Sequence, residues 1–237
     1  MEERGDTTLG DLTSPRAGAR SLAVLVVPVG ATEQHGPHLP VGTDTNIARA
    51  IAVRAAERRS DVLVAPAIAY GSSGEHQSFP GTLSIGAEVT EQLLVELGRS
   101  ATATWSRVLL LCAHGGNAAP VRRAVTRLRR EGRDVRDWWP CYPDGDLHAG
   151  DTETSLMLAL DPATVDADHV ATAVGPTASL AQLISPMQRG GVAAVSVNGV
   201  LGDARQAEAS KGTNMLEAAV ADLVDTLDAW AGGAGPT

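Results

Sequence analysis

The chain has 237 residues, of which 43% are hydrophobic, and a formal net charge of -9 at pH 7. This length favours one α/β domain, because a single core can grow to roughly 250 residues, and the acidic balance argues against a nucleic-acid partner. The N-terminus lacks the basic start and apolar stretch of a signal peptide, and no apolar run approaches the roughly 18 residues of a membrane span. The two cysteines make no disulfide framework. We therefore expect a cytoplasmic protein without a membrane partner.

Hydrophobic periodicity predicts strands and helices that alternate along the chain. The aliphatic run at 21–30 is typical of a strand buried on both faces. Further strands are expected at 61–71, 107–113 and 134–142, and helices at 43–59, 86–105, 117–132, 151–160 and 209–231. The segment 190–203 alternates like a strand but contains glycines, which indicates a late hairpin or loop.

This order of elements predicts the fold. Strands that alternate with helices form a mostly parallel sheet with helices on both faces, a three-layer α/β architecture. No linker or internal repeat divides the sequence, so residues 1–237 are expected to form a single domain. About 15 residues at the N-terminus and about 6 at the C-terminus are expected to be disordered. The arginine-rich run 121–133 has helical spacing and indicates a solvated helix face or a subunit contact.

Histidines and carboxylates cluster where the predicted strands end, at the edge where open α/β sheets bind ligands. They are Glu33 and His35 after the first strand, Asp44 at the start of the next helix, His114 after the third strand, and His148, Asp151 and Glu153 around another helix start. Imidazole and carboxylate together suit zinc, iron and manganese. A bridging carboxylate also lets two cations share one water. The pattern therefore predicts a crevice that binds divalent metals.

Some of these polar residues have simpler interpretations. His38 and His169 are expected to be hydrogen-bonded polar groups without a chemical role. Asp151 is expected to interact favourably with the dipole of the helix that it begins. No such structural role explains why the other four early candidates, from Glu33 to His114, occur together in this pattern.

Four stretches resemble the motifs of the creatininase (creatinine amidohydrolase) family. They are VPVGATEQHGPHLPVGTDT at 27–45, GSSGEHQSFPGTLS at 71–84, HGGN at 114–117 and HAGDTETS at 148–155, in the family's order and spacing. The resemblance covers about residues 20 to 205. Within the family, the stretches APAIAYGSSGEH, WPCYPDGDLHAGDTETS and SPMQRGGVAAVSVNGVLGD are most similar to the mycofactocin-system branch, a peptidase that trims the modified end of a ribosomally made redox-cofactor precursor.

The resemblance implies a role for each matched residue. Glu33 would bind a first metal, His35 a second, and Asp44 would bridge the two ions. His114 would complete the second site, and His148 would handle protons on the substrate side. Zinc, iron and manganese all accept such ligands, so the identity of the two metals stays open.

One departure from the family pattern concerns the third motif. Gly115 and Gly116 stand where creatininase itself has a tyrosine and a metal-binding glutamate, so one carboxylate is missing. Glu153 is expected to replace it and also to take part in catalysis, although it is alternatively a hydrogen-bond partner of a metal-binding histidine. The space left at the two glycines suits a bulkier substrate than creatinine, such as a peptide. Residues expected to contact the substrate are Ser73, His76, Gly115, Gly116 and Asn117.

The function that the resemblance implies is a dinuclear metal-dependent amide hydrolase. Its expected reaction is the release of the modified C-terminal Val-Tyr dipeptide from the mycofactocin precursor peptide. A cyclic-amide or formamide hydrolase is the alternative within the family, and a non-catalytic metal-binding scaffold is the alternative outside it. A radical enzyme and a short precursor peptide encoded next to this chain would favour the peptidase. Family members form closed homo-oligomers, so a homo-oligomer is expected.

Overall fold

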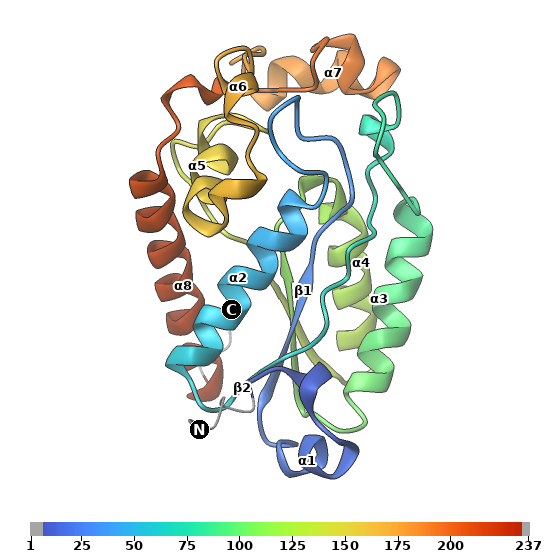
Figure 1. The fold of residues 1–237 in the computed structure, drawn as a ribbon. Helices are drawn as coiled ribbons and strands as arrows, with labels where there is room; N and C mark the ends of the chain where they lie inside the picture. The colour runs from blue at the N-terminus through green and yellow to red at the C-terminus, as the bar shows by residue number, and fades with distance from the viewer. Residues whose placement is uncertain (1–6, 234–237) are drawn as a thin grey trace.

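The computed structural model describes residues 7–233, which form a four-stranded sheet with helices on both sides (Figure 1). The strand order is β2-β1-β3-β4, and each neighbouring pair is parallel. The strands are β1 (Val24–Val29), β2 (Val62–Val64), β3 (Arg107–Cys112) and β4 (Asp134–Trp138). The expected three-layer α/β architecture with a parallel sheet is confirmed.

Five helices cover the sheet and produce its two outer layers. Helices α2 (Thr43–Arg58), α5 (Asp151–Leu160) and α8 (Ala209–Ala231) pack on one face, and α3 (Ala87–Ala101) and α4 (Ala118–Arg130) pack on the other. Successive side chains of β3 alternate between the two layers, since a strand turns neighbouring residues to opposite faces. Leu109 and Leu111 contact the first layer and Leu110 the second, and all three are fully buried. This double burial explains why β1, and β3 after Arg107, are continuously apolar.

Three helices of the structure were not among those predicted. They are α1 (Ser14–Ala19), α6 (Ala167–Val170) and α7 (Leu180–Gly190). The strand expected at 61–71 is shorter and ends at Val64, two residues before Pro66, which lacks the N–H group that a sheet ladder needs. The segment 190–203 is a loop, which is one of the two forms expected for it. Two isolated antiparallel bridges connect it to other parts of the chain, Leu201 to His148 and Asp203 to Val174.

The described part of the N-terminal segment is ordered. The amide of Val64 donates to the carbonyl of Thr7, and Leu9 and Leu12 pack against the core between the sheet, α3 and α4. The expected disorder is therefore wrong for residues 7–15, whereas residues 1–6 and 234–237 lie outside the described residues. Among residues 7–233, we find no helix with the length and apolar character needed to cross a bilayer.

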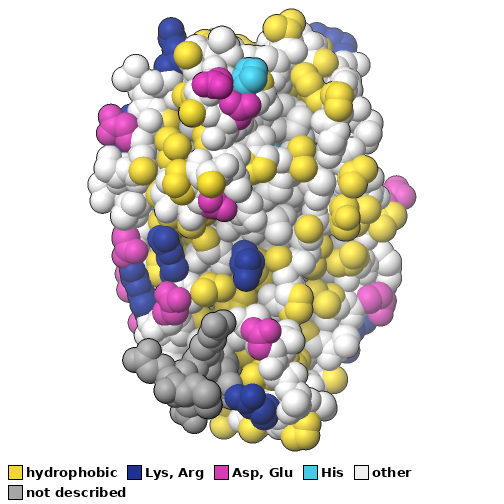
Figure 2. Space-filling view, viewed as in Figure 1, with side chains coloured by type: hydrophobic (Ala, Val, Ile, Leu, Met, Phe, Trp, Pro, Cys, Tyr) yellow, Lys and Arg dark blue, Asp and Glu magenta, His cyan; other side chains and the backbone are white. Residues whose placement is uncertain are grey.

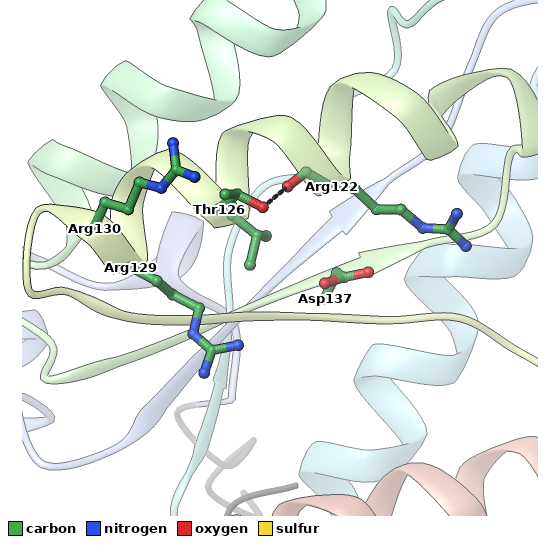
Figure 3. A pocket seen from close by; sticks show the side chains of 6 residues that line it. Arg122, Thr126, Arg129, Arg130 and Asp137 are labelled. Carbon is green, nitrogen blue, oxygen red and sulfur yellow. Dashed lines mark hydrogen bonds between the residues drawn. The ribbon is translucent and has the colours of Figure 1, made fainter. Parts of the chain in front are cut away.

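Most of the arginine-rich run lies on α4, and part of it lies beside the edge strand β4 (Figure 3), whereas Arg123 pairs with Glu91 of α3. Arg122, Arg129 and Arg130 line a hollow of about 640 Å³ together with Asp137 of β4. The guanidinium groups point in different directions instead of converging on one point. No candidate metal ligand lines this hollow, so it is a charged surface separate from the predicted metal crevice.

Candidate metal centre

The predicted metal ligands meet at the carboxyl ends of β1 and β3. Glu33 and His35 lie in the loop after β1, and His114 follows β3 directly. Asp44 and Glu153 lie in the first turns of α2 and α5. The first four side chains are buried, with Glu33 and His35 fully so. Three segments far apart in the sequence thus bring their polar side chains into one buried cluster.

Asp44 is the centre of this cluster. Its Oδ1 lies 3.2 Å from His35 Nε2, and its Oδ2 lies 3.3 Å from His114 Nδ1. Glu33 also approaches His114, because Glu33 Oε2 lies 3.2 Å from His114 Nε2. The Nε2–H group of His114 donates to the Ser72 carbonyl, 2.9 Å away, so Nδ1 is the ring nitrogen that faces Asp44 and becomes available to a cation when it loses its proton.

Glu153 approaches the other histidine. Its Oε2 lies 3.7 Å from His35 Nε2 and 4.0 Å from His148 Nδ1. The family resemblance implies that His114 shares a metal with His35, and that Glu153 supplies the carboxylate missing beside Glu33. In the structure His114 instead lies beside Glu33 and Asp44, and Glu153 lies beside His35.

Two further histidines border the cluster. His76 Nε2 lies 3.5 Å and His148 Nδ1 3.7 Å from the same oxygen, Glu33 Oε1. Three overlapping sets of side chains each place their ligand atoms within 4.8 Å of one another. These sets are Glu33 with His76 and His148, His35 with His148 and Glu153, and Glu33 with His35 and Asp44.

The unpaired oxygens of the cluster fit a cation. Both carboxylate oxygens of Glu33 and Oδ2 of Asp44 are buried without a hydrogen-bond partner. A buried polar atom without such a partner costs about 1–3 kcal/mol, and a charged one more. A divalent cation coordinated by these oxygens and the neighbouring imidazoles would remove that cost, and zinc, iron and manganese accept this mixture of ligands.

The electrostatics of the cluster separate its histidines into two groups. Burial disfavours the charged ring of His35, but Asp44, Glu153 and Glu33 outweigh it and raise its pKa to about 10. The pKa of His114 is also raised to about 10, because Glu33 and Asp44 outweigh its burial. Burial instead lowers the pKa of His76 to about 4, and burial with two neighbouring histidines lowers that of His148 well below its ordinary value. The first pair therefore holds protons where a cation would bind, and the second pair is neutral.

Cation binding to the metal-free protein is expected to release about two protons per chain near pH 7, because His35 and His114, each with a pKa of about 10, must lose their protons to become ligands. Cation and proton compete for the same nitrogens, so affinity should increase as the pH rises from 6 towards 10. Titration calorimetry with zinc in two buffers of different ionisation enthalpy measures the protons released. Affinity that does not change with pH would contradict this assignment.

The residues set aside as structural lie outside the cluster. His38 Nε2 is 2.7 Å from the hydroxyl of Thr154, and the exposed His169 contacts Asp166 at 2.8 Å. Asp151 forms a surface ion pair with Lys211 at 3.3 Å. None of these three residues belongs to a ligand set among the described residues.

The five residues predicted to contact the substrate do not all lie at the same cavity. His76, Gly115 and Gly116 line a cavity that adjoins the cluster, but Ser73 and Asn117 do not. The side chain of Asn117 is used within the protein, because it accepts from the Ser72 amide and donates to the Gly30 carbonyl. Asn117 thus holds the loops around the cluster in place.

The two glycines of the third motif differ in the space beside them. A Cβ at Gly115 would have open space around it. A Cβ at Gly116 would lie 2.2 Å from the Ser72 carbonyl and 2.5 Å from the carboxylate of Glu75. The expected empty space therefore exists at Gly115 only, and the carboxylate of Glu75 occupies part of the region beside Gly116.

The cavity has a volume of about 410 Å³ and two kinds of lining residue. Its polar side chains are those of Glu33, Glu75, His76, His114 and His148. The rest of its side-chain lining is mainly apolar and consists of Leu147, Leu201 and the α7 residues Leu180, Ile184, Met187 and Gln188. Figure 2 shows hydrophobic side chains exposed over α7 at the top of the molecule, and Leu180 and Ile184 are 50% and 40% exposed.

Glu75 and the α7 residues were missed by the sequence reasoning. Glu75 lies next to His76 in the motif at 71–84, and this position could have indicated that Glu75 belongs to the site. In α7, Leu180, Ile184 and Met187 have the helical spacing i, i+4, i+7 that marks one helix face. Pro186 inside this helix and the short length conceal that pattern.

The chain resembles known proteins over nearly its whole length. A family model described as creatininase, creatinine amidohydrolase, matches residues 10–227. A mycofactocin precursor peptide peptidase from Mycolicibacterium smegmatis is 48% identical, over 87% of this chain and 85% of the relative. A creatinine amidohydrolase from Pseudomonas putida is 32% identical, over 92% of this chain and 95% of the relative. A solved structure named Creatininase Mn has a TM-score of 0.81 at 29% identity, over 94% of this chain and 97% of that chain.

These matches confirm the family resemblance drawn from the four motifs. The fold similarity extends beyond the motifs to the arrangement of sheet and helices, and the name of one solved relative specifies manganese. The cluster of carboxylates and imidazoles lies on the same motifs that carry the resemblance. The chain belongs to the creatinine amidohydrolase (creatininase) family and is a metal-dependent hydrolase.

Proposed function

We propose that this chain is a peptidase that releases the modified C-terminal Val-Tyr dipeptide from the mycofactocin precursor peptide. Its relative from Mycolicibacterium smegmatis, 48% identical, is named for that precursor. The observation that carries the proposal is the cavity that candidate metal ligands and apolar side chains of α7 line together. Its volume of about 410 Å³ lies within the roughly 300–1,000 Å³ of sites that hold small organic ligands.

The ligand set supports two cation positions that share Asp44. One position would use Glu33, Asp44 and Nδ1 of His114, the nitrogen that faces Asp44, and the other would use His35, Asp44 and Glu153. Two divalent cations, when bound, supply Lewis acidity towards the scissile carbonyl and a lowered pKa for water. Zinc, iron and manganese are the candidates.

The remaining polar groups of the cavity act on the substrate. His148 turns Nδ1 towards Glu33 and Glu153, where it can accept a proton from water and return it to the leaving amine. Burial raises the pKa of Glu153 to about 7, and the carboxylate of Glu153 lies within 4.0 Å of the same nitrogen. The apolar side chains of α7 that line the cavity hold the aliphatic and aromatic parts of the dipeptide and keep water from them.

A comparison of substrates tests this function. The metal-loaded protein should cleave the modified precursor and leave creatinine and formamide derivatives unchanged at the same concentrations, as monitored by liquid chromatography with mass detection. Hydrolysis of creatinine with an intact precursor would instead support the cyclic-amide alternative, the activity named for the Pseudomonas putida relative. Binding of cations without hydrolysis of any of these compounds would support the scaffold. The homo-oligomer stays a prediction, which light scattering can test.

Replacing Ile184 with serine is expected to raise KM for the modified precursor by about tenfold, because the loss of an apolar contact in a pocket costs about 1–3 kcal/mol. Ile184 is 40% exposed, so the fold should tolerate the change. The matched control is Val89→Ser on α3, which is 56% exposed and does not line the cavity. Equal KM values for both variants would show that α7 does not bind the dipeptide.

A further inference from the structure

Gln34 lies between two candidate ligands in the sequence and is buried beside both. Its Oε1 accepts from the backbone amide of Gly36 at 2.8 Å, and its Nε2 donates to the carbonyl of Gly199 at 3.0 Å. A backbone amide only donates and a carbonyl only accepts. These two contacts therefore fix which end of the Gln34 side chain is oxygen and which is nitrogen.

The second hydrogen of Gln34 Nε2 determines the state of His76. His76 Nδ1 lies 2.8 Å from Gln34 Nε2, so Nδ1 must be the acceptor and the ring hydrogen lies on Nε2. That Nε2 is the atom 3.5 Å from Glu33 Oε1. His76 thus turns an N–H group towards the ligand cluster.

The backbone of Gln34 determines the state of His148. His148 Nε2 lies 2.9 Å from the Gln34 carbonyl oxygen, so Nε2 carries the hydrogen and Nδ1 has a lone pair. Gln34 Nε2 is also 3.0 Å from His148 Nε2, but both of its hydrogens are already used. The two rings share one tautomer, yet His148 turns its lone pair to the cluster and His76 its N–H group.

The surroundings hold Gln34 in this position. Gly199 has a φ of +84°, and a Cβ there would lie 1.9 Å from Gln34 Oε1. The backbone amide of Gln34 donates to the hydroxyl of Thr82 at 3.1 Å. A flip of the amide would place its NH₂ group against the Gly36 amide and its oxygen against the Gly199 carbonyl, so these two contacts hold its ends as assigned.

We propose that Gln34 is a positioning residue that makes His76 a hydrogen-bond donor and His148 an acceptor in the same cavity. The tautomers follow from the contacts alone, whereas their use rests on the proposed peptide hydrolysis. As water adds to the scissile carbonyl, negative charge grows on its oxygen, and the neutral His76 Nε2–H donates a hydrogen bond to it. The His148 lone pair stays available for a proton or a cation.

The tautomers can be measured directly by ¹⁵N NMR of zinc-loaded protein labelled at its six histidines. The wild-type protein should show the hydrogen on Nε2 in both His76 and His148. In Gln34→Glu, a carboxylate can only accept, so the His76 hydrogen should move to Nδ1. His148 should not change, because a backbone carbonyl holds it.

Measurement of kcat and KM in two variants tests the same proposal, and one of the variants is a matched control. Gln34→Glu should lower kcat by about 10²-fold, the loss typical of one donor to a developing oxyanion, with a much smaller change in KM. Gln77→Glu makes the same chemical change one residue from His76 on an exposed side chain, and it should alter neither tautomers nor kcat.

A wild-type spectrum with the His76 hydrogen on Nδ1 would overturn the proposal, and this result does not depend on the folding of any variant. An unchanged His76 tautomer in a folded Gln34→Glu protein would overturn it as well. The expected tautomers without cleavage of the precursor would support the positioning by Gln34 and overturn the peptidase function.

Discussion

Replacement of Asp44 with alanine is expected to remove bound cations and hydrolytic activity together. The two carboxylate oxygens of Asp44 contact different histidines, at 3.2 Å from His35 and 3.3 Å from His114, so both cation positions lose a ligand. The cations stabilise the transition state by several kcal/mol, and kcat/KM should therefore fall by at least about 10³-fold. Plasma mass spectrometry of the purified variant measures the cation content.

Asp151→Ala is the matched control for this variant. Asp151 also lies in the first turn of a helix, but its carboxylate pairs with Lys211 at the surface, and such pairs contribute about 0–1 kcal/mol. His38→Ala should keep the cations too, because His38 contacts Thr154 outside the ligand sets. Equal losses of activity in Asp44→Ala and His38→Ala would show that the role of His38 has been misjudged.

Glu153→Gln is expected to remove one cation and leave the other bound. Glu153 Oε2 lies 3.7 Å from His35 Nε2, so the position beside His35 should be lost, whereas the position beside His114 keeps Glu33 and Asp44. Glutamine retains a carbonyl oxygen for the amide of Ala149, which donates to Glu153 Oε2, so the main change is the lost charge. The expected decrease in kcat/KM is about 10²-fold or more.

Cation titrations of this variant separate two roles of Glu153. If Glu153 only hydrogen-bonds a metal-binding histidine, both cations should remain with affinity weakened by about 10–100-fold. If both affinities are unchanged, Glu153 has neither role. Asp151 is not expected to supply the missing carboxylate in that case, because it is paired with Lys211. Glu75 beside Gly116 would be the next carboxylate to test.

Much of the fold was predictable because burial leaves a clear trace in the sequence. β1 is apolar at every position, and β3 is apolar after Arg107, because both faces of the sheet are covered. The ligand positions were predictable for a related reason, since the ends of parallel strands meet at one edge. Glu33, Asp44 and His114 lie where that argument placed them.

The pairing within the cluster was not predictable from the sequence. Whether His114 or Glu153 faces His35 depends on how α5 packs beside the loop after β1, and sequence spacing does not encode that packing. The crowding at Gly116 was equally hidden, because it arises from the backbone of Ser72 and the side chain of Glu75. The role of α7 was missed because its exposed apolar residues face a cavity rather than the main core.

The mass of the fragments that the metal-loaded protein releases from the modified precursor peptide tests the peptidase function most directly. We expect one cleavage, which yields the modified Val-Tyr dipeptide and the shortened precursor, and no cleavage after the cations have been removed with a chelator. Cleavage at any other bond, or the same cleavage by protein shown to be free of metal, would contradict this expectation.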